Sequence, residues 1–121
     1  MASRNPDVRS QPEPPSRTDT LVASDLEYRP GARVRIRVVR REHRAWVSDD
    51  GGAVEEAGQP PGWKAVARRI GDELAVNVSR GGAISLPVVR VGPPEAEVIR
   101  RVGEASIAFY QELFELAGYE S

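Results

Sequence analysis

The sequence predicts an α+β domain in two layers, in which an antiparallel sheet of about five strands packs against helices that include a long one at the C-terminus. Two Gly-Gly pairs lie between segments in which apolar and polar residues alternate, and such pairs are typical of hairpin turns between strands. Two other segments repeat apolar residues every three or four positions, which is the period of a helix packed on one side. A chain of 121 residues has room for one domain of this kind.

Residues 1–20 are expected to form a disordered, Pro-rich tail, and residues 21–121 a single α+β domain. The tail holds four prolines, and Val8 is its one large aliphatic residue after the initiator methionine. A segment of this composition cannot bury enough apolar surface to offset the entropy that it would lose on ordering.

The first strands are predicted from alternation. Residues 21–30 leave two possibilities open, a short edge strand or one helical turn. Residues 33–38 alternate strictly between Arg and aliphatic side chains, which is the period of a half-buried strand. A turn then leads to a second strand at 44–48, and the pair Gly51-Gly52 is expected to turn the chain into a third strand at 53–57. Consecutive antiparallel strands of this kind form a meander.

The middle of the chain predicts a helix and then a second hairpin. Residues 63–74 place their apolar side chains on one stripe, as a helix docked on a core does. The pair Gly81-Gly82 separates two short alternating segments and predicts a hairpin with strands near 76–78 and 84–88. Pro87 has no N–H to donate to a neighbouring strand, so we expect this strand to lie at an edge or to end there.

The last helix is expected to begin after Gly92-Pro93-Pro94 and to run for about 24 residues, with Gly118 as its stop. Its main apolar stripe repeats at intervals of three or four residues from Val98 to Leu116. Further side chains beside the stripe widen it, so the helix either spans a curved sheet or also contacts a partner. The candidate partner-binding residues are Ile99, Tyr110, Leu113 and Ala117.

Arginine is concentrated in the first part of the chain. Residues 1–44 hold ten Arg against six acidic residues, whereas residues 45–121 hold seven Lys and Arg against twelve acidic residues. Three of the arginines share one face of the 33–38 strand, about 7 Å apart, and such a row can follow a phosphate backbone. The favoured alternative is a solvated face that Glu55 or Glu56 partly neutralises. The candidate nucleic-acid or anion contacts are Arg33, Arg35, Arg37 and Arg44.

The sequence offers little for catalysis or metal binding. His43, the single histidine, falls in a turn among arginines, and such histidines are usually solvent-exposed. The acidic pairs Asp49-Asp50 and Glu55-Glu56 lack the spacing of a calcium loop, and Asp is a common turn residue. Because strands are expected after both Gly-Gly pairs, neither pair has the strand-loop-helix setting of a phosphate loop. We therefore expect no enzyme, no cofactor and no metal site.

Two resemblances extend over residues 34–119. The expected order β-β-β-α-β-β-α is similar to that of type III secretion chaperones, which are small acidic dimers that bind partner segments without catalysis. Those proteins begin with a helix, which only residues 21–28 could supply here. The motifs VSDDGG at 47–52, VNV at 76–78 and FYQEL at 109–113 resemble an uncharacterised family of bacterial and phage domains, which implies a bacterial or phage origin. Neither resemblance carries a functional residue over to this chain.

The function expected from these features is that of a non-enzymatic protein-interaction module, adaptor-, chaperone- or inhibitor-like, which forms a homodimer. The alternative is a nucleic-acid-binding or regulatory protein that uses the Arg-rich strand. The sequence has no cysteine and no apolar run long enough to span a bilayer, so we expect a cytoplasmic protein that has no disulfides and no contact with membranes.

Overall fold

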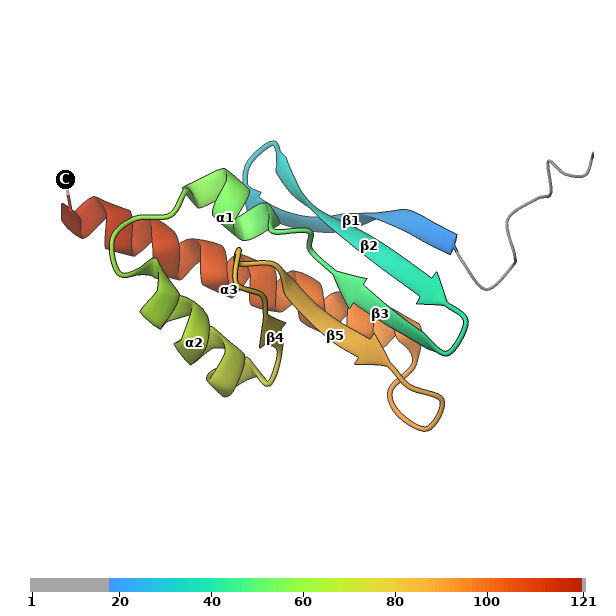
Figure 1. Ribbon diagram of the computed structural model, residues 1–121. Coiled ribbons are helices and arrows are strands. Elements are labelled where there is room, and N and C mark those ends of the chain that lie inside the picture. Colours follow the sequence, from blue (N-terminus) through green and yellow to red (C-terminus); the bar gives the residue numbers. More distant parts are fainter. Residues whose placement is uncertain (1–17, 121) are drawn as a thin grey trace, which may run out of the picture.

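Five antiparallel strands form one sheet, and a long C-terminal helix packs across one of its faces (Figure 1). The computed structural model describes residues 18–120, except for the side chains of Tyr119 and Glu120. The strands are β1 (Thr18–Arg29), β2 (Ala32–Arg41), β3 (Arg44–Ser48), β4 (Asn77–Val78) and β5 (Ile84–Val88), in the order β1-β2-β3-β5-β4. The helices are α1 (Gly52–Ala57), α2 (Trp63–Leu74) and α3 (Glu95–Glu120). The predicted α+β class is confirmed.

The hydrophobic core lies between the sheet and α3. Alternate residues of β2, namely Val34, Ile36 and Val38, are almost fully buried in the core. They belong to the same core as the apolar stripe of α3, whose Phe109 and Leu113 are fully buried. The predicted helix α2 adds a second stripe beside α3. Because successive side chains of a strand point to opposite faces, burial of these aliphatic residues places Arg33, Arg35 and Arg37 on the other face.

The third predicted strand is wrong, because residues 53–57 belong to helix α1. Asp50 and Gly51 both take left-handed backbone conformations, with φ of 54° and 76°, and the chain leaves the sheet there. β5 pairs with β3 along the side that the third strand was expected to take. The segment also suits a helix, since Ala and Glu have high helix propensity. The pair Gly51-Gly52 therefore leads into a helix and is not a hairpin turn.

Residues 21–30, for which the sequence allowed either a strand or a helical turn, belong almost entirely to a strand. β1 begins at Thr18, ahead of the expected domain boundary, and its pairing with β2 brings the sheet to five strands. The rest of the predicted tail, residues 1–17, lies outside the described residues. The expected number of strands is therefore right, although one of the five was expected in the wrong segment.

β1 contains a bulge. Its register with β2 is interrupted between Ala23 and Glu27. Inside this interval the Ser24 hydroxyl donates to the carbonyl of Val34 at 2.9 Å and accepts from the N–H of Leu26 at 3.2 Å. A side chain thus takes over hydrogen bonds that backbone groups would form in a regular ladder.

The second hairpin is confirmed. Ser79 donates its N–H to the carbonyl of Ala83 at 2.8 Å, and Gly82 takes a φ of 98°. A Cβ on Gly82 would lie 2.4 Å from a methyl of Val54, so glycine is needed here both for its backbone and for close packing against α1. Pro87 lies past the residues of β5 that pair with β4, so β5 has one neighbouring strand there, as expected for an edge position.

The expected long helix is also confirmed, but its expected stop is wrong. Pro94 opens α3, and its carbonyl accepts from the N–H groups of Glu97 and Val98. Gly118 lies inside the helix, which continues to Glu120. A glycine ends a helix where its backbone turns left-handed, and Gly118 is not among the residues with positive φ in the described part of the chain.

Gly52 lets α1 begin directly against Tyr28, because a Cβ added to it would lie 2.4 Å from the Tyr28 hydroxyl. We expect Gly52→Ala to lower the free energy of unfolding by about 1–3 kcal/mol, the usual cost of overpacking a filled site. Gly81→Ala is the matched control, since a Cβ there meets no atom within 4 Å. Urea denaturation of both variants measures the effect, and equal midpoints would contradict the prediction.

Candidate functional site

The sheet has a second face, opposite α3, which we call the outer face. α3 packs across the strands, whereas α1 packs on α3 and α2 packs on α3 and β4. In Figure 1, α3 runs behind the sheet, so the outer face is turned toward the viewer. The outer face carries Asp19, Leu21 and Ala23 of β1, Arg33, Arg35, Arg37, Val39 and Arg41 of β2, Arg44, Trp46 and Ser48 of β3, and Ser85 and Pro87 of β5.

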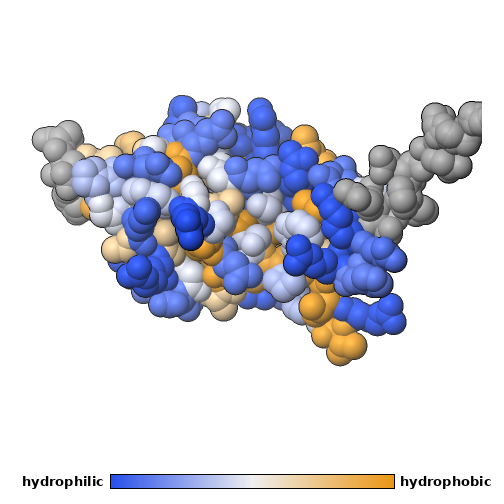
Figure 2. Space-filling model, viewed as in Figure 1, coloured by the Kyte–Doolittle hydropathy of each residue, from blue (hydrophilic) through white to orange (hydrophobic). Residues whose placement is uncertain are grey.

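An apolar stripe crosses the outer face from strand to strand. Val39, Trp46 and Pro87 are register partners on three adjacent strands, and these three residues are the apolar stripe. Val39 is only 5 % exposed, so half-buried Trp46 and exposed Pro87 supply the accessible surface of the stripe. Figure 2 shows small, separate hydrophobic patches on a mostly hydrophilic surface and a hydrophobic protrusion at the lower right. The loop between β5 and α3 lies at the position of this protrusion, and its Val91 is 92 % exposed.

Arginines border the apolar stripe. The guanidinium carbons of Arg44 and Arg41 lie 4.6 and 5.8 Å from the centroid of the Trp46 ring. Arg41 also donates to Asp19 at 2.8 Å, whereas Arg44 forms no ion pair with an acid of residues 18–120. An arginine stacked on an aromatic ring keeps N–H donors for a further partner. Arg44 is therefore a charged group available for binding next to an apolar surface.

The structure separates Arg44 from the other candidate anion contacts. Arg33, Arg35 and Arg37 share one face of β2, as the alternation predicts. Arg44 instead pairs with Arg41 beside the β2–β3 turn, at the far end of the strand. The register of the β2–β3 hairpin thus separates Arg44 from arginines that lie close to it in the sequence.

Acids partly neutralise the arginine row of β2. Glu27 of β1 faces Arg33 at 4.0 Å, and Asp50 of the loop after β3 accepts from Arg37 at 2.7 Å. The hydrogen bond to Asp50 raises the pKa of Arg37 above its ordinary value. The expectation of a partly paired face is thus fulfilled, but by different acids from the predicted Glu55 or Glu56.

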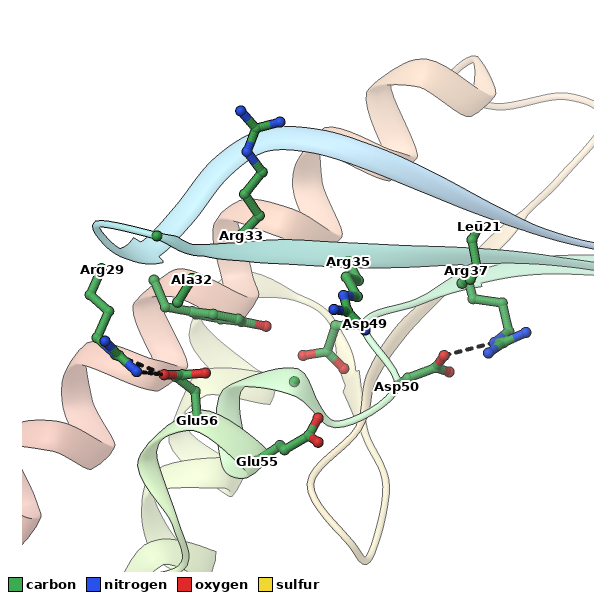
Figure 3. Close-up of a pocket in the computed structure, with 13 residues that line it drawn as sticks. Leu21, Arg29, Ala32, Arg33, Arg35, Arg37, Asp49, Asp50, Glu55 and Glu56 are labelled. Carbon is green, nitrogen blue, oxygen red and sulfur yellow. Dashed lines mark hydrogen bonds and ion pairs between the residues drawn. The ribbon is translucent and has the colours of Figure 1, made fainter.

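A pocket of about 550 Å³ opens between the β1–β2 hairpin and α1 (Figure 3). Arginines of the strands line one wall, and acids of α1 and of the loop before it line the other. The lining residues are Leu21, Tyr28, Arg29, Gly31, Ala32, Arg33, Arg35, Arg37, Asp49, Asp50, Gly52, Glu55 and Glu56.

Two ion pairs join the walls of the pocket. Each joins an arginine of the strands to an acid of the opposite wall, Arg29 to Glu56 at 2.5 Å and Arg37 to Asp50 at 2.7 Å. In Figure 3 these pairs stand toward the two sides of the view, with Arg35 and Glu55 between them. Within residues 18–120, neither Arg35 nor Glu55 forms an ion pair.

A buried hydrogen-bond network lies at the base of the pocket and is centred on Asp49, which is 2 % exposed. One carboxylate oxygen accepts from the N–H groups of Gly51 at 2.9 Å and Ile84 at 2.8 Å, and the other accepts from the hydroxyl of Ser106 at 2.6 Å. The Tyr28 hydroxyl lies 2.7 Å from that of Ser106. Because Ser106 gives its proton to the carboxylate, Tyr28 donates to Ser106.

Burial raises the pKa of both ionisable groups in this network. It raises the pKa of Asp49 above its ordinary value, although hydrogen bonds from Ser106 and two backbone N–H groups oppose the shift. It raises the pKa of Tyr28 to about 12, against the lowering effect of the hydrogen bond with Ser106. Every one of these polar groups has a partner, so we interpret the network as structural support for the pocket.

The loop at Gly51-Gly52 connects strand β3 to helix α1, whereas a strand was expected after it. The order of elements therefore does not exclude a phosphate loop there. The acidic residues around the loop nevertheless exclude a phosphate site. Asp50 and Glu55 line the pocket beside this loop, and their carboxylates repel an anion.

The four candidate partner-binding residues of α3 lie mostly inside the domain. Leu113 is fully buried, and Tyr110 is buried with its ring centroid 5.3 Å from that of Tyr28. These two side chains therefore do not face outward, while Ile99 and Ala117 are half-buried. Phe114, which is 63 % exposed and stacks on Tyr110, is the large apolar side chain that α3 does expose. The sequence did not predict Phe114 as a contact residue, because it lies outside the main apolar stripe of α3.

The single histidine lies apart from the pocket. His43 lies in the exposed turn between β2 and β3, 3.7 Å from Glu42. Within residues 18–120, no three His, Asp or Glu side chains are grouped as ligands for a metal ion. None of the helices in this part of the chain combines the length and the apolar character needed to cross a bilayer.

Comparisons with known proteins find no match: no family model, no curated protein and no solved structure is similar to this chain. The two resemblances seen in the sequence therefore stay predictions. The outer face and the pocket are therefore the features that bear on function.

The raised pKa of Asp49 makes stability depend on pH in a defined direction. The unfolded chain releases this proton near 3.8, whereas the folded protein keeps it to higher pH. The resulting contribution to stability is complete below the unfolded value and is lost as pH rises through the folded value. We expect the free energy of unfolding of the natural protein, relative to Asp49→Asn, to be larger near pH 4 than near pH 7. Urea denaturation at both pH values measures it, and the opposite trend would contradict it.

Proposed function

We propose that this protein is a non-enzymatic protein-interaction module, adaptor-, chaperone- or inhibitor-like, which binds its partner through the outer face of the sheet. The observation that carries the proposal is the apolar stripe of Val39, Trp46 and Pro87, bordered by Arg41 and Arg44. Tryptophan and arginine are enriched among the residues that supply most of the binding energy in protein interfaces. Both residue types meet here on a face opposite the core.

The charges of the outer face favour a partner segment in which apolar side chains lie beside acidic ones. Apolar groups of the partner cover Trp46 and Pro87, and a neighbouring carboxylate meets Arg44. Asp19 already pairs with Arg41, so Arg44 contributes more to affinity than Arg41 does. Leu21 on β1, which is 62 % exposed, extends the apolar area.

The proposal moves the partner surface from α3 to the sheet. Burial of Tyr110 and Leu113 supports this change, because α3 uses most of its apolar arc in the core of its own domain. A second copy of the chain is one partner of the proposed kind, so the homodimer remains part of the proposal. We also propose a cytoplasmic protein of bacterial or phage origin, on the basis of the cysteine-free sequence and its motifs.

Site-specific photo-cross-linking in a lysate of the native host tests the proposal. A benzophenone amino acid at Leu21 is expected to form an adduct with a protein, and the same group at Arg68, exposed on α2, is expected not to form that adduct. Adding Arg44→Glu is expected to lower the yield at Leu21 at least about tenfold, because repulsion replaces a charge-assisted contact. An adduct between two copies would identify a homodimer. No protein adduct at Leu21 would contradict the proposal.

Nucleic-acid binding is the second candidate, and the row of Arg33, Arg35 and Arg37 on one strand face is the observation in its favour. The ion pairs of Arg33 with Glu27 and of Arg37 with Asp50 weaken the case for nucleic-acid binding. If it is correct, fluorescence anisotropy with a labelled single-stranded oligonucleotide should show affinity that falls steeply with salt. Arg35→Gln should weaken binding and Arg68→Gln should not. A lack of binding at low salt would remove this candidate.

A further inference from the structure

We propose that the pocket between the β1–β2 hairpin and α1 binds a small zwitterionic molecule, with its carboxylate toward Arg35 and its ammonium or guanidinium group toward Glu55. This inference concerns a ligand different from the protein partner of the outer-face proposal. The pocket adjoins the apolar stripe and shares Leu21 with the proposed partner surface, but its charged pair, Arg35 and Glu55, is not used there.

The two walls of the pocket carry opposite charge, and this decides the class of ligand. Arginines of β1 and β2 form one wall, and acids of α1 and its preceding loop form the other (Figure 3). An ion of a single sign is attracted by one wall and repelled by the other. A zwitterion in one orientation meets an opposite charge at each end, so it gains from both walls.

Arg35 and Glu55 are the charged pair that is open to such a ligand. The arginine on each side of Arg35 in Figure 3, Arg29 and Arg37, already has an acid of the opposite wall as its partner. Arg33 extends away from the acidic wall in the same view. Within the described residues, Arg35 and Glu55 line the pocket without an ion-pair partner, so their hydrogen-bonding groups are available to a ligand.

The size of the pocket and the interactions around it also suit a small ligand. A volume of about 550 Å³ lies within the range of small-molecule sites. Leu21 and Ala32 supply apolar surface for the aliphatic part of a ligand. The hydrogen bonds of Tyr28 and Asp49 hold the base of the pocket, and the two wall-to-wall ion pairs hold its sides, so a ligand orders few further groups on binding.

Three probes of nearly equal length separate the possible ligand classes: 6-aminohexanoate carries both charges, hexanoate only the negative one and hexylamine only the positive one. Each is titrated into the full chain labelled with ¹⁵N, and backbone amide shifts are followed by NMR. We expect 6-aminohexanoate to shift the amides of Gly31, Asp50 and Gly52. We also expect it to bind at least about tenfold more tightly than either single-charge probe, since a hydrogen bond to a charged group is worth that factor or more.

Neutral variants then test each end of the ligand. Arg35→Gln and Glu55→Gln are each expected to weaken 6-aminohexanoate binding at least about tenfold, toward the level of a single-charge probe. Arg68→Gln and Glu73→Gln, two exposed positions on α2, are the matched controls and are expected to leave binding unchanged. Arg35 and Glu55 are themselves exposed, and an unchanged amide spectrum outside the pocket verifies that the variants fold.

Three results would overturn the inference. Hexanoate that binds as tightly as 6-aminohexanoate, with no effect of Glu55→Gln, would identify a plain anion site. Equal binding by the Arg35→Gln variant and the natural protein would remove the proposed carboxylate contact. No shift at the pocket with any of the three probes would remove the site. None of these results bears on photo-cross-linking at the outer face, so the two proposals fail separately.

Discussion

The buried carboxylate of Asp49 is the interaction on which the rest of the structure depends. It accepts N–H groups from Gly51 and Ile84 and the hydroxyl of Ser106, through which it also reaches Tyr28. One charged group thereby joins β1, the start of α1, β5 and α3. A charge buried without partners is costly, so loss of any of these donors would destabilise the fold. The orientation of α1, and with it the acidic wall of the pocket, follows from this arrangement.

The same residue explains why the sequence misplaces a strand. The N–H of Asp49 donates to the carbonyl of Ile84, and the Asp49 side chain accepts the N–H of Ile84, so a side chain completes the β3–β5 ladder where the backbone leaves it. Two glycines after two aspartates show that the chain turns, but not whether it returns to the sheet. That choice is made by a contact between residues 35 positions apart, which local patterns do not contain. By contrast, the strict alternation of β2 and the regular stripe of α3 each depend on a single periodicity, and both are predicted correctly.

The candidate site, like the fold, is only partly predictable from the sequence. Alternation alone places Arg33, Arg35 and Arg37 on one exposed face, because it fixes the opposite face as core. The acidic wall is not predictable in this way, since it requires that residues 53–57 form a helix facing the β1–β2 hairpin. Only the register of β2 with β3 places Trp46 beside Val39 on the outer face. The burial of Tyr110 depends in turn on β1, because its ring packs against that of Tyr28 at 5.3 Å between centroids.

The bulge in β1 affects how this protein behaves among its own copies. β1 is the first strand of the sheet, and within residues 18–120 no other strand pairs with its outer edge. A long, regular edge of this kind is a template on which another chain can polymerise. The bulge interrupts this regularity: the Ser24 hydroxyl accepts from the N–H of Leu26 and donates to the carbonyl of Val34 in β2, in place of a regular backbone ladder. A bulged strand bends and twists locally, and this makes the outer edge of β1 a poorer template for a further strand than a flat, regular edge would be.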